Sequence, residues 1–307
     1  MPKGREGGSQ RSPLRWWRRQ EARLLGLTGS PHDVRHAIRA REEQVLRWVG
    51  ISALVGVLTG ASVAVFDYVL RDQIIFYLYT ASNALLYALL PAVGLALSRW
   101  LLIWLVKGGD GQLTEAYISA YHDPARRLGL RDVPGKLLAS LVTIGSGGGL
   151  GLEGPSVFLG ASLGDSIQKH YGRLFSREDA KLLLVAGAAA GMAAIFKAPL
   201  TGVIFSFECP YKDGLRSKAL VPALVASGSS YVTFVLLVGS EPIFAHAGAL
   251  EFGLVEVLLA GVLGLLCGAG AWLFGALVRG IRRLLGFLPE WVRPLAAGFA
   301  VGGIGAL

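Results

Sequence analysis

The sequence predicts an all-α polytopic membrane protein with broken and re-entrant helices, and three observations lead to this prediction. The chain has 307 residues, of which 53% are hydrophobic and only 17% charged, with a mean hydropathy of +0.52. This is too apolar for an ordinary soluble domain. Several uncharged runs approach or exceed the ~18 residues that indicate a spanning helix. Many of the 42 glycines lie inside these runs, where glycine lets helices pack closely or break.

The first uncharged run follows a basic arm, residues 1–47, in which Lys and Arg outnumber Asp and Glu. Such an arm is typical of the cytoplasmic side of a membrane protein. We therefore expect a multi-pass protein of the cell (plasma) membrane with a cytoplasmic N-terminus. The first two spans are predicted to be joined by a short loop around residues 67–72. The predicted spans are 48–66, 74–98, 219–240 and 257–278.

The stretch from residue 108 to residue 208 does not follow this pattern. Its apolar pieces are interrupted by Gly, Pro and single charges, and none alone reaches the usual spanning length. Short or interrupted membrane helices expose backbone N–H groups at membrane depth, so they are the best sequence indication of a transport site. A Ser-x-x-acid pattern at 176–179 predicts the start of one such helix. The apolar pieces are 137–152, 154–164, 182–196 and 198–207.

Glu153 is the only charged residue between positions 137 and 164. An acid at membrane depth costs about 2.5–3.5 kcal/mol, so it usually marks a pathway. Pro155 suits the first turn of a helix, and the N-terminus of that helix would face Glu153. Free N–H groups and the helix dipole form an anion site there. Glu153 can occupy this site or leave it when protonated, and would thus gate a diffusing anion. The alternative is a loop acid between two short helices of a soluble protein.

Two ordered stretches of this sequence resemble signature motifs of the CLC chloride channels and proton-coupled chloride transporters. The first combines Gly135-Lys136 with Gly-Leu-Glu-Gly-Pro-Ser at 151–156, and the second combines 186–202 with Phe-Ser-Phe-Glu at 205–208. The resemblance covers roughly residues 46–307. It implies the first half of a CLC-type inverted repeat, with the start of the second half behind it. The implied organisation is a basic arm at 1–47, a first repeat holding the anion site at 48–208, and the start of a second repeat at 209–307.

The resemblance implies transport of chloride or a related small anion, with no enzymatic activity and with no cofactor or metal. Carried over position by position, it assigns Glu153 as the gate. For Glu208 there is a structural alternative, an ion pair with Lys212 or Arg216 at a helix end. The implied anion-binding residues are Asp110, Gly111, Thr114, Gly154, Ser156 and Val157, with the backbone amides of the last three as donors. The implied proton pathway is Glu153, Glu208 and Cys209.

Three positions depart from the family pattern. Leu152 replaces the usual Arg or Lys, which removes a cation near the pathway. Asp110 replaces a serine whose hydroxyl touches the anion. An ionised carboxylate ~4 Å from chloride would repel it by about 4 kcal/mol at an effective dielectric of 20. Asp110 is therefore turned away as a helix N-cap, or protonated, or it alters selectivity. Cys209 stands at the proton-transfer position, where a thiol replaces a carboxylate poorly. We therefore expect channel-like or weakly proton-coupled transport.

The last apolar run begins at residue 294 and reaches Leu307 well short of the ~20 residues of a crossing helix. The family's second half, which completes the anion site and contributes to its dimer interface, has no match in the sequence. We therefore expect a truncated copy, which would be a homodimer if full length. Two other functions are open, a non-conducting relic or subunit and an unrelated inverted-repeat secondary transporter. Binding of nucleic acid by the basic arm has no recognisable domain to support it.

Overall fold

The computed structural model describes residues 31–75, 84–123, 125–171, 181–210, 217–241 and 253–305. These residues form helices joined by turns, and none of them lies in a β-strand. The predicted all-α polytopic membrane fold is confirmed. Contacts divide the chain into two units, residues 1–51 and 52–307. Three described helices are long and apolar enough to cross a membrane: Val45–Asp72, Leu220–Val238 and Leu254–Leu285.

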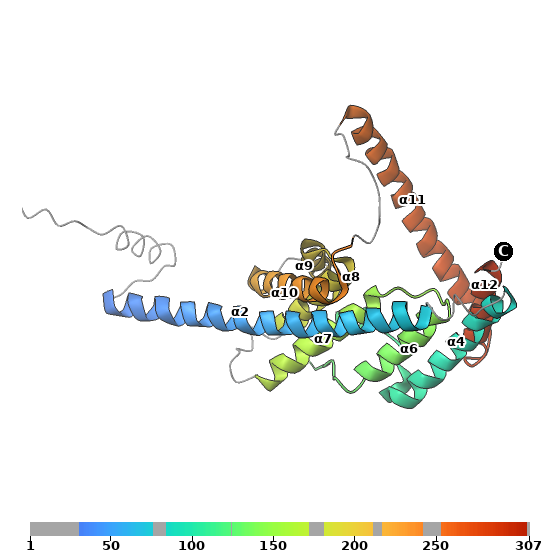
Figure 1. Cartoon of the computed structure of the whole chain (residues 1–307), viewed down its shortest axis with the longest axis horizontal. Helices are drawn as coiled ribbons and strands as arrows, with labels where there is room; N and C mark the ends of the chain where they lie inside the picture. The colour runs from blue at the N-terminus through green and yellow to red at the C-terminus, as the bar shows by residue number, and fades with distance from the viewer. Residues whose placement is uncertain are drawn as a thin grey trace, which may run out of the picture. The chain divides into compact units, whose positions relative to one another are not determined.

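The first span is longer than predicted. Helix α2 (Pro31–Tyr68) continues directly into a π-helix, η1 (Val69–Ile75), and Figure 1 shows α2 as one long helix. The predicted loop around residues 67–72 is therefore wrong. The reason lies in the pairing of two charges one turn apart, since Arg71 Nε lies 2.7 Å from Asp67 Oδ1. The pair lets the helix continue through a charged segment that sequence polarity alone marks as a loop.

The predicted broken region forms a series of short helices. Helix α7 extends past the predicted piece at both ends, whereas α8 has the predicted bounds. The capping pattern at 176–179 lies outside the described residues. The helices are α5 (Thr114–His122), α6 (Val133–Gly145), α7 (Glu153–His170), α8 (Leu182–Phe196) and α9 (Pro199–Glu208).

The centre of the second unit is the packing of α7 against α8. Every residue of α8 except Phe196 is buried. The two helices approach so closely that a Cβ atom on Gly187 would overlap the backbone carbonyl of Gly160, and one on Gly160 would overlap the carbonyl of Gly187. Small residues allow this approach, which supplies packing where lipid gives no hydrophobic driving force.

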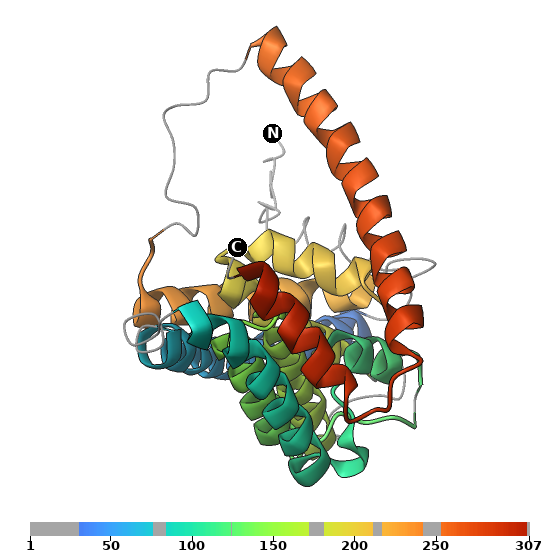
Figure 2. The ribbon, with the colours of Figure 1, turned by 90° about the vertical axis from the view of Figure 1, so that its right-hand side faces the viewer.

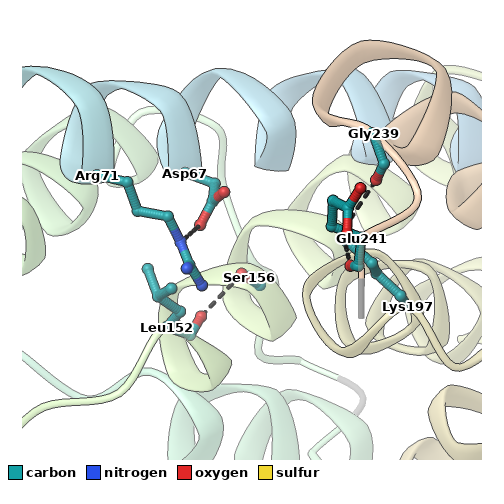
Figure 3. Close-up of polar contacts among 7 residues, drawn as sticks. All are labelled: Asp67, Arg71, Leu152, Ser156, Lys197, Gly239 and Glu241. Atoms are coloured by element: carbon teal, nitrogen blue, oxygen red, sulfur yellow. Dashed lines mark hydrogen bonds and ion pairs between the residues drawn. The ribbon is translucent and has the colours of Figure 1, made fainter. Parts of the chain in front are cut away.

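Two further helices complete the described chain around this centre. Helix α10 (Leu220–Val238), which follows the short η5 (Ser217–Ala219), packs on α8, and Ser230 Oγ donates to the carbonyl of Ala190 at 2.8 Å. Lys197, just past the end of α8, donates from Nζ to the carbonyls of Gly239 at 2.9 Å and Glu241 at 2.6 Å (Figure 3). This contact fixes the end of α10 and places a cation where the helix dipole favours one.

The remaining described helices of the second unit are α4 (Ala84–Leu105), η2 (Lys107–Gly109), α11 (Leu254–Leu285) and α12 (Arg293–Gly305). Helices α4 and α12 lie side by side (Figure 2), and a Cβ on Gly298 of α12 would overlap the backbone of Ala92 of α4. Helix α11 has no buried residue. This 32-residue helix is largely exposed and largely apolar, which is typical of a segment that lipid or other membrane helices cover.

Candidate anion site

The N-termini of α5 and α7 meet, although 38 residues separate Thr114 from Leu152 in the sequence. A Cβ atom on Gly154 would lie 3.2 Å from Leu113 Cδ1 and 3.8 Å from Thr114 Oγ1. The first turn of α7 therefore lies against the first turn of α5. Both helices present positive dipole ends and unpaired N–H groups at this point. The structure thus brings Thr114 and Gly154 together, as an anion site requires.

The first turn of α7 uses some of the predicted donors itself. The Ser156 amide donates to the Leu152 carbonyl at 3.1 Å, and Ser156 Oγ donates to the same oxygen at 2.8 Å (Figure 3). The amide of Val157 lies where the helix ladder uses it. The Ser156 amide is thus already hydrogen-bonded within the helix, and the anion-binding role of Ser156 and Val157 stays a prediction. Gly154 precedes the first ladder bond, so its amide is among the free donors of the helix start.

Glu153 is exposed and is the first residue of α7. Its carboxylate turns back over Gly151, since a Cβ atom on Gly151 would overlap Glu153 Oε2. A side chain at position 151 would therefore displace the carboxylate from this position. A carboxylate at a helix N-terminus is stabilised by the same dipole that attracts a free anion. Glu153 is thus an exposed carboxylate at the helix start.

Asp110 does not point an unpaired charge at the helix termini. Its Oδ1 accepts the Gln112 amide at 2.8 Å, and its Oδ2 lies 3.6 Å from Arg126 Nη2 and 3.7 Å from Lys136 Nζ. Asp110 is not the N-cap of α5 either, because that position belongs to Leu113, which makes no side-chain capping bond. Arg126 and Lys136 therefore compensate the charge of Asp110. The alternative N-cap role of Asp110 is therefore wrong, whereas its anion-binding role stays a prediction. Gly111 is exposed in the same turn.

Lys136 supplies the buried cation behind this turn. It is 4% exposed, and its Nζ donates to the carbonyl of Gln112 and lies 4.5 Å from the centre of the Phe158 ring. One side chain of α6 therefore holds the turn before α5 against the first turns of α7. The sequence marked Lys136 only as part of a motif, and its contacts with Asp110 and Phe158 become visible only in the structure.

The predicted proton-pathway residues of α9 lie at its far end. Glu208 is exposed and Cys209 is half-buried. Burial raises the pKa of the Cys209 thiol above its ordinary value, and the nearby carboxylate of Glu115 raises it further. Helix α9 is held to α5 by the Tyr117 hydroxyl, which donates to the carbonyl of Ser206 at 2.7 Å. The sequence did not identify Glu115, an acid in the first turn of α5 that the fold brings near Cys209.

A second charge near the start of α7 was also missed. Asp67 is only 3% exposed and holds Arg71 Nε at 2.7 Å. In Figure 3 the Arg71 side chain points toward the turn that contains Leu152 and Ser156. The same η1 segment contacts α6, because a Cβ on Gly145 would overlap Ile74. Arg71 is therefore a cation, paired with Asp67, whose side chain points toward this turn. A sequence reading could have noted it only as an acid and a base one turn apart.

These features define a class of protein, a helical membrane protein in which broken helices direct their N-termini at a common point, as anion transporters do. The sequence matches the profile of the voltage gated chloride channel family over residues 93–307. The chain therefore belongs to the CLC family, and the resemblance noted in the sequence is confirmed.

Two relatives illustrate the range of similarity. The chain is 29% identical over 266 residues to a chloride/fluoride channel protein of Pseudomonas syringae pv. tomato, covering 84% of this chain and 56% of the relative. It is 27% identical over 202 residues to an uncharacterized protein of Methanocaldococcus jannaschii, covering 66% of this chain and 47% of the relative. The chain thus spans about half the length of these curated relatives.

Solved structures support the fold independently. A slow cyanobacterial Cl⁻/H⁺ antiporter superposes with a TM-score of 0.71 at 22% identity, covering 85% of this chain and 64% of the antiporter. A CLC-type fluoride/proton antiporter superposes with a TM-score of 0.71 at 23% identity, covering 84% of this chain and 64% of the antiporter. At such identities the likeness establishes the arrangement of helices, while the transported ion and the coupling are separate questions.

Proposed function

We propose that the full-length protein moves chloride or a related small anion across the cell membrane, past the N-termini of α5 and α7, with Glu153 as the gate. The observation that carries this proposal is the contact of the two helix starts, where Gly154 lies against Leu113 and Thr114. Two converging dipole ends attract an anion without a fixed countercharge, so the ion can bind and leave.

The ligands of the anion follow from which donors the fold leaves free. We assign the amide of Gly154 and the hydroxyl and amide of Thr114 to the anion, and Gly111 to the turn that leads to them. The amide of Ser156 is consumed by Leu152. Lys136 and Arg126 offset the charge of Asp110. This compensation lowers the repulsion, which would be about 4 kcal/mol for an unpaired carboxylate ~4 Å from the anion at an effective dielectric of 20.

Flux through liposomes tests the transport proposal. The full-length protein, reconstituted into vesicles loaded with chloride, is expected to release chloride when valinomycin balances the charge, and a matched vesicle set loaded with fluoride gives the preference between the two anions. The variant Gly151→Leu is compared with the unaltered protein, because the added side chain would displace the Glu153 carboxylate. Chloride release no faster than from vesicles without protein would favour the alternative of a non-conducting protein or subunit.

Proton coupling is expected to be weak, and the reason is Cys209. Burial and Glu115 raise the pKa of this thiol, so the thiol stays protonated at neutral pH and ionises only at more alkaline pH. A protonated thiol cannot accept a proton from Glu208 or Glu153. A chloride gradient should therefore drive little proton movement, measured with a pH electrode outside the vesicles.

The matched pair Cys209→Glu and Cys209→Ser tests this explanation. Glutamate restores a carboxylate at the position and should increase the number of protons moved per chloride, whereas serine should leave that number unchanged. Proton movement at a fixed ratio to chloride in the unaltered protein would contradict the assignment.

Homodimer formation and a cytoplasmic N-terminus are also part of the proposal. The basic arm supports the cytoplasmic N-terminus.

A further inference from the structure

A cavity of about 800 Å³ lies at the end of α7 opposite Glu153. Its wall comes from two parts of the chain, the connection between α5 and α6 and the last turns of α7. Four basic side chains and one acid line it, and the acid is buried. The polar lining residues are Arg127, Arg131, Asp165, Ser166, Lys169 and His170.

The wall of this cavity is held rigidly. Asp165, 2% exposed, accepts from Arg127 Nη1 at 2.8 Å and from the Leu128 amide at 2.9 Å. Lys181, itself 7% exposed, donates from Nζ to the carbonyl of Arg126 at 2.8 Å. Two buried charged side chains from α7 and from the start of α8 thus fix the basic connection from both sides. Such anchoring sets the position of charges before any ligand arrives.

Among the described residues, the other basic side chains of the cavity have no acidic partner. Arg131, Lys169 and His170 form no ion pair with any described residue, whereas Asp165 is already committed to Arg127. Lys169 and His170 also complement the negative end of the α7 dipole, but that role accounts for neither Arg131 nor the cavity. The cavity therefore has an excess of positive charge with donors available for an anionic ligand.

Apolar side chains at the same place indicate the kind of ligand. Leu130 lines the cavity and is 47% exposed, and Tyr171 stacks edge-on with His170 at 5.1 Å and is 41% exposed. Exposed Tyr beside basic residues is typical of the membrane–water interface. A free phosphate has no use for these apolar surfaces, whereas a lipid has a charged head and an apolar body.

We propose that this cavity binds the phosphate-bearing headgroup of an anionic lipid, with Arg131 and Lys169 as the principal cations. Basic pockets between membrane helices bind such headgroups, and each Lys or Arg near an anionic lipid surface strengthens the attraction. The site lies away from the junction of α5 and α7, so its test does not depend on anion transport.

Native mass spectrometry of the detergent-purified full-length protein tests the site with phosphatidylglycerol as the probe. The double variant Arg131→Gln/Lys169→Gln is compared with Arg282→Gln/Arg283→Gln in the last turn of α11, which removes the same charge from another exposed position. We expect the first variant to weaken binding of phosphatidylglycerol by about tenfold or more, and the second by less than about twofold.

Three results would overturn the proposal in different ways. Equal weakening by the two double variants would indicate general attraction of charges without a site. Unchanged binding by both would show that the cavity is not occupied by this lipid. Displacement of phosphatidylglycerol by inorganic phosphate as effectively as by added phosphatidylglycerol would keep the recognition of phosphate but exclude the lipid as its source. Retained thermal stability of each variant shows that a lost signal does not come from unfolding.

Discussion

Replacing Glu153 by glutamine is expected to leave anion flux intact and to abolish its dependence on pH. Glutamine keeps the size of the side chain but is permanently neutral, so it neither competes with the anion at the start of α7 nor binds a proton. In the unaltered protein, flux should rise as the pH falls, because a protonated Glu153 leaves the site. In the variant, flux should be high throughout. Chloride efflux from liposomes at a series of pH values measures the flux of the unaltered protein and of the variant.

The chain offers a close control for this experiment. Glu256 is also an exposed acid in the first turn of a helix, α11, and its carboxylate also turns back over a glycine, Gly253. Glu256→Gln removes the same charge from the same kind of helix position but away from the contact of α5 and α7. Its flux should keep the original pH dependence. If Glu153→Gln also keeps it, Glu153 is not the gate.

A single methyl group added at Gly187 is expected to destabilise the protein by about 1–3 kcal/mol, the usual cost of overpacking. The added Cβ would overlap the carbonyl of Gly160, and backbone cannot move aside as a flexible side chain can. Helices α7 and α8 would have to separate, which also displaces the start of α7 from α5. We therefore expect Gly187→Ala to lower both the melting temperature in detergent and the chloride flux.

Gly228→Ala is the matched control for this effect. Gly228 lies inside α10, and a Cβ there would meet no atom within 4 Å. Alanine favours a helix over glycine by about 1 kcal/mol, so this variant should be as stable as the parent or slightly more stable. The midpoints of SDS-induced unfolding compare the two variants. A Gly187→Ala protein as stable as Gly228→Ala would show that α7 and α8 are not packed through their glycines.

Local sequence predicted the elements well where the signal is itself local. The bounds of α8 match the apolar piece 182–196, because apolar runs and breaks are read directly from neighbouring residues. The position of Glu153 at a helix start was also predicted, since Pro155 and the glycines around it restrict the backbone there. The loop expected at 67–72 was wrong for the opposite reason. Asp67 and Arg71 form an ion pair one turn apart, so this charged segment continues as helix and does not form a loop.

The amino-acid sequence by itself determined that this is a helical membrane protein of the CLC family, with an acid at a broken helix. Hydropathy, glycine content and ordered motifs carry that information without reference to distant residues. Only the tertiary structure decided how the site is built. Asp110 forms ion pairs with Arg126 and Lys136, and Cys209 lies near Glu115. The charge of a group in a membrane depends on its partners, and residues far apart in sequence become partners only when the helices pack.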